Sequence, residues 1–256
     1  MKKLIYPIFL TGLIVAIAAS CEDEQVFFKD ITVAEGARVK FVHGASDAAG
    51  VDFFLNNSKI SSGSTSGTAT AYALTYPGTN YAAVEAGSYE VRATVPATTS
   101  TSEINLVTGS LAVENDRYYT IALVGVSPNY ETATIADDEQ PTPADGQAYI
   151  RLVNLIHNSA NNLSLVGTPP VPAGGPPVTL ASNVGFKKGS PFIAITPGLY
   201  TSVQLKDAGS GTVIATLSAA NSTFAGNKVY TIFARGQLGL TASDPKRALV
   251  DRMINR

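Results

Sequence analysis

The sequence ARVKFV at residues 37–42 recurs as AYIRLV at residues 148–153. The separation of Ala37 from Ala148 defines a repeat offset, and two further blocks recur at the same offset: AVEAGSY at 83–89 as AITPGLY at 194–200, and YTI at 119–121 as YTI at 230–232. Gly125 and Gly236 extend the last match. Chance can supply one such block but not three in register, and self-similarity at a fixed period indicates a repeated structural unit. We therefore interpret the chain as a duplication.

Short apolar patterns predict strands within each unit. Val39 and Phe41 alternate with Arg38 and Lys40, which is typical of a strand with one buried face. Residues 119–124 are apolar on both faces and predict a central strand. No part of either unit has a sustained apolar period of 3.6 residues. We therefore expect an all-β fold of two tandem antiparallel β-sandwich domains of the immunoglobulin-like kind.

Composition sets the expected boundaries of these domains. Residues 127–146 are polar and contain Pro141 and Pro143, which is typical of a linker. The expected domains are then residues 36–126 and residues 147–240. The tail at residues 241–256 is predicted to be a short helix or a frayed end.

Two glycines occupy equivalent places in the repeat. Gly87 and Gly198 each lie between two predicted strands. Glycine adopts positive φ without steric cost, so these positions favour a tight hairpin turn. We predict that both are structural turn residues.

The first 21 residues resemble an export signal. Two lysines precede the apolar run LIYPIFLTGLIVAIA, and Ala19-Ser20-Cys21 supplies small residues before a cleavage point. One interpretation is an ordinary signal peptide at residues 1–20, followed by a cysteine by coincidence. The other is a lipoprotein signal, because Ala18-Ala19-Ser20-Cys21 resembles a lipobox, although leucine is usual where Ala18 stands. We favour the second interpretation.

Lipidation of Cys21 would make the lipid bilayer the first partner of this protein. Several acyl chains, each contributing about 0.8 kcal/mol per buried CH₂, give stable anchoring where one chain is marginal. Residues 21–35 would then form an acidic tether. Glu22-Asp23-Glu24 resembles the export tag of surface-displayed lipoproteins, with a solvated flexible start as the alternative. The expected location is the outer membrane, facing outside.

Charge argues against nucleic acid as a partner. The formal net charge is −2 over 256 residues. Without Lys2 and Lys3, 16 basic residues face 20 acidic ones, which gives a net charge of −4. Phosphate binding needs a basic patch, and the sequence has none.

Three stretches of the first unit resemble a known family. They are ARVKFVHGASDAAGVDFFLN, YAAVEAGSYEVRAT and DRYYTIALVG. They are similar to the domain of unknown function number 4397, and the second unit matches more loosely, with Asn154 where the first has His43. The resemblance would cover residues 36–126 and 147–240. It implies exported, often lipid-anchored β-sandwich proteins and no established activity, substrate or cofactor.

A search for catalytic groups leaves only weak candidates. His43, Ser46 and Asp47 are close in sequence, but a catalytic triad needs convergence that neighbours in one loop rarely achieve. The alternative is that His43 hydrogen-bonds the loop after its strand. The other histidine, His157, has no counterpart in the first unit. No nucleotide-binding, metalloprotease or nucleophile-elbow motif occurs, so we expect no enzyme activity and no cofactor.

Two binding sites were also considered. Asp47 and Asp52 could supply oxygen ligands to Ca²⁺, but the remainder of a calcium loop is missing, and we predict no metal site. Tyr72, Tyr76 and Tyr81 could stack on sugars, although strand tyrosines more often line a core or a sheet edge. The leading hypothesis is a non-enzymatic binding or structural module for a glycan or protein ligand at the cell envelope. The competing hypothesis is an envelope hydrolase or metal-dependent enzyme.

Overall fold

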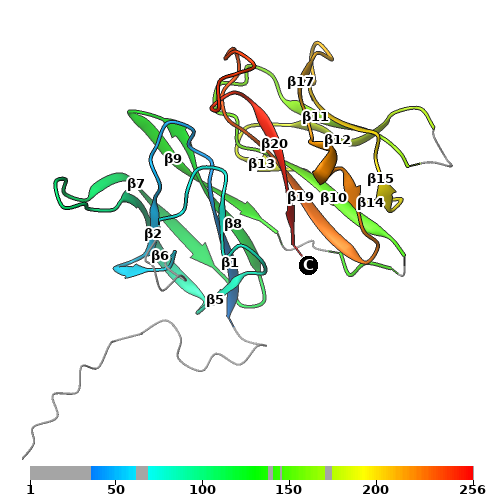
Figure 1. The fold of residues 1–256 in the computed structure, drawn as a ribbon. Helices are drawn as coiled ribbons and strands as arrows, with labels where there is room; N and C mark the ends of the chain where they lie inside the picture. Colours follow the sequence, from blue (N-terminus) through cyan, green and yellow to red (C-terminus); the bar gives the residue numbers. More distant parts are fainter. Residues whose placement is uncertain (1–35, 62–68, 138–140, 145, 171–174, 256) are drawn as a thin grey trace, which may run out of the picture.

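The computed structural model describes residues 36–61, 69–137, 141–144, 146–170 and 175–255 (Figure 1). These residues form strands, turns and one 3-10 helix, η1 (Ala219–Asn221). The predicted all-β fold is confirmed. The strands belong to two units, and each unit has two main sheets.

The described residues of the first unit form nine strands. They are β1 (Ala37–His43), β2 (Asp52–Leu55), β3 (Ser58–Lys59), β4 (Thr75–Tyr76), β5 (Ala82–Val84), β6 (Gly87–Val95), β7 (Ile104–Val113), β8 (Tyr118–Val126) and β9 (Asn129–Ala136). One sheet has the order β4-β1-β8-β9, with β5 also paired to β1, and the other has the order β3-β2-β6-β7. The rings of Phe41 and Phe53 stack at a centroid distance of 5.0 Å, so the core joins β1 of one sheet to β2 of the other.

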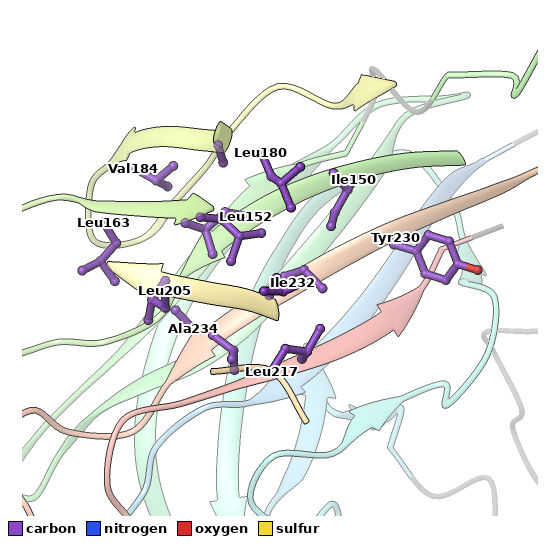
Figure 2. Close-up of a cluster of buried hydrophobic side chains, with 14 of the residues drawn as sticks. Ile150, Leu152, Leu163, Leu180, Val184, Leu205, Leu217, Tyr230, Ile232 and Ala234 are labelled. Atoms are coloured by element: carbon purple, nitrogen blue, oxygen red, sulfur yellow. The ribbon is translucent and has the colours of Figure 1, made fainter. Parts of the chain in front are cut away.

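The second unit repeats this plan. Its strands are β10 (Ala148–Asn154), β11 (Leu163–Thr168), β12 (Val178–Val184), β13 (Lys188–Gly189), β14 (Ile193–Ile195), β15 (Gly198–Leu199), β16 (Ser202–Asp207), β17 (Val213–Thr216), β18 (Thr223–Phe224), β19 (Lys228–Arg235) and β20 (Leu249–Ile254). The main sheets are β13-β10-β19-β20, with β14 on β10, and β12-β11-β16-β17; β15 and β18 form a small ribbon. Figure 2 shows Leu152, Leu205 and Ile232 together in the core between the main sheets.

The sandwich sheets are antiparallel as expected except at the central strand pair of each unit, which is parallel. Arg38 pairs with Tyr118 between β1 and β8, and Tyr149 pairs with Val229 between β10 and β19. The two strands of each pair are joined through the opposite sheet, and such a crossover can return the chain in the same direction. The two registers are related by the repeat offset found in the sequence.

A pair of glycines shows how closely the two units agree. Gly125 has φ of +91° and Gly236 has φ of +92°. A Cβ atom at either position would lie 2.2 Å from a backbone carbonyl oxygen, that of Asn129 or Arg247. Only glycine fits such a close approach at positive φ. Both units therefore require glycine at this position, where the central strand ends close to a backbone carbonyl.

Gly87 and Gly198 are not the tips of hairpins, contrary to the prediction. β5 pairs with β1, whereas β6, which begins at Gly87, pairs with β2 and β7. The chain thus crosses from one layer of the sandwich to the other between β5 and β6. Gly198 likewise begins the ribbon strand β15, which follows β14, the strand paired to β10. Both glycines have positive φ, at +157° and +135°.

The expected linker and tail each contain a strand. β9 lies within residues 127–146 and pairs along the length of β8, and β20 lies within residues 241–256 and pairs with β19. β9 buries alternate residues, Ala133 and Ile135, and its polar and small neighbours hide this period in the sequence. The second sandwich therefore extends to Ile254, and the first to Ala136.

The two units pack through equivalent sheets. A buried apolar cluster joins Val42, Ala122 and Ile135 of the first unit to Val153, Phe233 and Met253 of the second. This packing buries the face of β1 that the alternating pattern had marked as polar, and Lys40 is fully buried. Both faces of β1 and of β10 are therefore covered, one by the sandwich core and one by the other unit.

Candidate functional site

The residues considered as a catalytic triad each have a structural partner. His43 is buried, and its Nε2 lies 2.8 Å from the carbonyl oxygen of Ala49. Burial lowers the pKa of His43, and this hydrogen bond opposes the shift. The contact agrees with the interpretation that His43 holds the loop after its strand.

Ser46 and Asp47 hold that loop to other segments. The hydroxyl of Ser46 accepts a hydrogen bond of 2.8 Å from Gln237 Nε2 in the second unit. The carboxylate of Asp47 accepts hydrogen bonds from the Ser127 N–H at 2.9 Å and from the Tyr130 hydroxyl at 3.1 Å. Burial, and next the charge of Asp47, raise the pKa of Tyr130 to about 12. The loop after β1 is thus tied to the β8–β9 turn and to the second unit.

The candidate calcium ligands have different surroundings. Asp52 is buried in β2 and forms an ion pair of 2.7 Å with Lys59, whereas Asp47 contacts the β8–β9 turn. Within the described ranges, no group of three or more histidine, cysteine, aspartate or glutamate side chains could hold a metal ion.

The three tyrosines considered for sugar stacking lie at sheet edges and between the units. Tyr76 lies in the short edge strand β4 and pairs with Phe41 of β1. The ring of Tyr72 packs against the guanidinium of Arg235 at 4.6 Å. The hydroxyl of Tyr81 donates a hydrogen bond of 2.9 Å to Asp137. These rings serve packing between segments rather than forming a common platform.

The predicted lipidation and export residues, Cys21 and Glu22-Asp23-Glu24, lie outside the described residues. Among the helices of the described part of the chain, none is long and apolar enough to span a membrane.

A cavity of about 440 Å³ lies on the second unit, between β17 and the loop that joins β19 to β20. Ligand pockets commonly have volumes of roughly 300–1,000 Å³. Thr216, Gln237 and Arg247 give polar groups to its wall, and Ile214, Leu238 and Leu240 give apolar ones. None of the described residues that line it is aromatic. The cavity can therefore offer hydrogen bonds beside apolar contact, without a stacking platform.

The loop behind this cavity distinguishes the second unit from the first. In the first unit only residues 127–128 separate β8 from β9, whereas residues 236–248 separate β19 from β20. Loops on a shared scaffold tolerate insertions and carry specific function. The cavity is thus built by an insertion that one unit has and the other lacks.

Hydrogen bonds hold this loop in place. Asn158 and Leu238 exchange two hydrogen bonds, of 3.1 Å and 2.9 Å. The N–H of Gln237 donates to the carbonyl of Lys246, and its side chain reaches Ser46 of the first unit. A site with such support is largely preformed. The cavity could not be found from the sequence repeat, because the insertion becomes evident only when β20, which begins at Leu249, is aligned with β9, which begins at Asn129.

No curated protein matches this chain. One solved structure, described as a putative cell adhesion protein from Bacteroides fragilis, is similar over 86% of this chain and 97% of that chain, with 10% sequence identity and a TM-score of 0.23. A likeness at this level carries no argument about function.

The family model of the domain of unknown function DUF4397 matches residues 37–164. The match begins at β1, spans the first unit and ends in β11 of the second. It covers half of the chain, and this protein therefore belongs to the DUF4397 family.

Proposed function

We propose that this protein is an outer-membrane lipoprotein, anchored through acylated Cys21, that binds a glycan or protein ligand without enzymatic activity. The observation that carries the proposal is the cavity behind the β19–β20 loop. This loop and β17 lie at the end of the molecule opposite to the start of β1 (Figure 1). A tether at residues 21–35 would thus enter at one end, with the cavity presented at the other.

The duplication supports the proposal in a second way. The shared register and the matched glycines support the proposal that the second unit is a further copy of the family domain, whose model matches only residues 37–164. In this view the first copy adjoins the anchor, and the second copy has acquired the loop that makes a binding site. A scaffold duplicated in this way can change one copy without loss of the other.

Binding at the cavity can be tested with two exposed leucines of the second unit. Leu240 lines the cavity, whereas Leu199 lies in β15 away from it. The full chain is screened on a glycan array and by chemical cross-linking on the cell surface. We expect Leu240→Asp to abolish the binding that is found, and Leu199→Asp to retain it. Equal binding by both variants would place the ligand elsewhere.

Anchoring is tested independently of the ligand. Cys21→Ser should move the protein from the detergent phase to the aqueous phase in a partitioning assay, because several acyl chains are lost. Persistence in the detergent phase would contradict lipidation of Cys21.

Surface display has its own test. Replacing Glu22, Asp23 and Glu24 with alanine should protect the protein from external protease on intact cells, while Cys21 still holds it in the membrane. Unchanged cleavage from outside would show that these acidic residues are no export tag.

A further inference from the structure

The interface between the units contains two clusters of side chains, one around Arg151 and one around Lys40, that are related by the repeat offset. Each cluster is called a corner of the interface. Lys40 corresponds to Arg151, Tyr81 to Phe192, and Thr120 to Thr231, all at the offset that relates Ala37 to Ala148. Asp137 and Asn255 also correspond, because each follows the last strand of its sheet. The Asp137 N–H donates to the Tyr118 carbonyl at 2.7 Å, and the Asn255 N–H donates to the Val229 carbonyl at 2.8 Å.

One of these corners is electrostatically complete. The guanidinium of Arg151 forms a buried ion pair with the carboxylate of Asp137, across the interface. Its Nε donates to the Thr231 hydroxyl at 3.0 Å, and the ring of Phe192 packs over it at 4.6 Å. The cation and the anion therefore satisfy each other.

The corresponding corner contains Lys40 of the first unit and Asn255 of the second, and both residues contact Tyr81. Lys40 is fully buried, and neither its Nζ nor the Oδ1 of Asn255 has a hydrogen-bond partner among the described residues. A buried ammonium and a buried carbonyl without such partners are both costly.

A single side chain joins the groups at this corner. The Nζ of Lys40 lies 4.7 Å from the centroid of the Tyr81 ring. The Nδ2 of Asn255 donates a hydrogen bond of 3.1 Å to the Tyr81 hydroxyl, which donates one of 2.9 Å to Asp137. An amine, a carboxamide and a carboxylate thus surround one tyrosine, away from solvent.

We propose that Lys40 and Asn255 are joined by an intramolecular isopeptide bond that forms at this corner. The Lys40 amine attacks the carboxamide carbon of Asn255, a new N–C bond forms, and the bond from that carbon to Nδ2 breaks. The attacking nitrogen gives its proton to the Asp137 carboxylate. The Tyr81 hydroxyl gives a proton to the departing Nδ2 and regains one from Asp137. An amine and a primary amide thus become a secondary amide and ammonia, and no oxidant, reductant or cofactor is needed.

The surroundings favour each part of this reaction. A lysine amine is nucleophilic only when neutral, and burial lowers the pKa of Lys40 to about 8, although the charge of Asp137 opposes the shift. Burial and then the charge of Asp137 raise the pKa of Tyr81, so its hydroxyl stays protonated and can donate. The leaving nitrogen already faces that hydroxyl. Exclusion of water from the corner prevents competing hydrolysis.

The bond would join the two units. Within the described residues, Lys40 lies in β1, the first strand of the first unit, and Asn255 follows β20, the last strand of the second. Their covalent union would clamp the two units together at the corner that lacks an ion pair. A module held by one end at a membrane would then resist separation of its units.

The experiment is peptide mapping of the full chain after unfolding and digestion with trypsin. In the proposed product, Met253-Ile254-Asn255-Arg256 is joined to the peptide of residues 39–59, with no cleavage after Lys40. The mass of the joined species is lower by one ammonia than that of its two parts. Recovery of a separate Met253–Arg256 peptide, together with cleavage after Lys40, would overturn the proposal.

Variants test the chemistry. Lys40→Arg and Asn255→Ala should each abolish the joined peptide, whereas Lys188→Arg, at an exposed lysine of β13, should leave it intact. Tyr81→Phe and Asp137→Asn should slow its formation at least tenfold. Tyr81→Phe keeps the ion pair of Asp137 with Arg151, so it remains informative if Asp137→Asn fails to fold. If the joined peptide forms at an unchanged rate in both variants, Tyr81 and Asp137 do not transfer protons in this reaction.

Discussion

Arg151, in the first strand of the second unit, forms a buried ion pair with Asp137, which follows the last strand of the first unit. The two side chains are at most 3% exposed. The pair joins residues that are close in sequence but belong to different sandwiches, and it lies beside the apolar cluster that the two units share. The contact between the two units therefore includes a buried ion pair as well as buried apolar side chains.

The first prediction concerns this pair. Arg151→Met leaves the Asp137 carboxylate buried without its cation, and loss of one partner from a buried pair costs about 3–5 kcal/mol. We expect a loss of this size in the free energy of unfolding, measured by urea denaturation. The matched control is Lys187→Ala, which removes an exposed ion pair with Glu131 across the same interface. Exposed pairs contribute about 0–1 kcal/mol, so equal losses would contradict a dominant role for the buried pair.

The second prediction concerns a chain in which Lys40 keeps a free amine, as in Asn255→Ala. The pKa of Lys40 is lowered from 10.5 to about 8 in the folded protein. The unfolded chain therefore binds the proton more tightly, and stability is lowered at every pH below about 8. As pH rises from about 8 to 10.5 this cost disappears, and it amounts to about 3 kcal/mol at 1.36 kcal/mol per pKa unit.

Adding Lys40→Met to Asn255→Ala removes the titrating group. The double variant should be more stable than Asn255→Ala at pH 7, and the difference should shrink by pH 10.5. Urea unfolding at a series of pH values measures this. A difference that is constant with pH would show that the pKa of Lys40 is the same in the folded and the unfolded chain, and would contradict the lowered value.

The third prediction separates the two crossover glycines. A Cβ atom at Gly198 would lie 2.8 Å from Cβ of Pro170, whereas at Gly87 the nearest atom, Cε2 of Tyr89, is 3.9 Å away. Both positions have positive φ, which strains other residues by about 1–3 kcal/mol. Gly198→Ala should therefore lower the melting temperature more than Gly87→Ala does. The reverse order would mean that contacts with Pro170 relax at no cost.

The fourth prediction concerns the loop behind the cavity. Ser46→Ala removes the hydroxyl that accepts from Gln237, a hydrogen bond contributing about 0.5–1.5 kcal/mol. We expect faster hydrogen exchange in residues 237–248, with exchange in β6 unchanged. The control is Asn105→Ala, which removes an exposed hydrogen bond to Thr108 in β7. Exchange in the loop that is unaffected by Ser46→Ala would show that the first unit does not support the cavity.

The repeat and the fold class could be predicted because they depend on local patterns. The repeat offset placed Arg38 and Tyr149 in equivalent strands, and it related Gly125 to Gly236, which share φ and the same close approach. Alternation of apolar residues predicted strands at both places. The reason is that strand formation and glycine conformation are decided largely by the residues themselves and their neighbours in the chain.

The strands β9 and β20 could not be predicted from the same patterns. Thr132 and Thr134 of β9 stand on either side of Ala133, and the segment looks polar before its pairing with β8 is known. The cavity depends on the same pairing, because the β19–β20 loop is recognised as an insertion only when β20 is aligned with β9.

The sequence by itself determined that the chain is all-β, that it is built on a repeat, and where most strands lie. The tertiary structure decided which surfaces meet. Lys40 alternates with apolar neighbours and has the pattern of an exposed residue, yet it is fully buried. Alternation reports that two faces of a strand differ, but it does not report which of them becomes buried. Around Lys40, the ring of Tyr81 and the Asp137 and Asn255 side chains that Tyr81 contacts come from distant parts of the chain, and only folding brings them together.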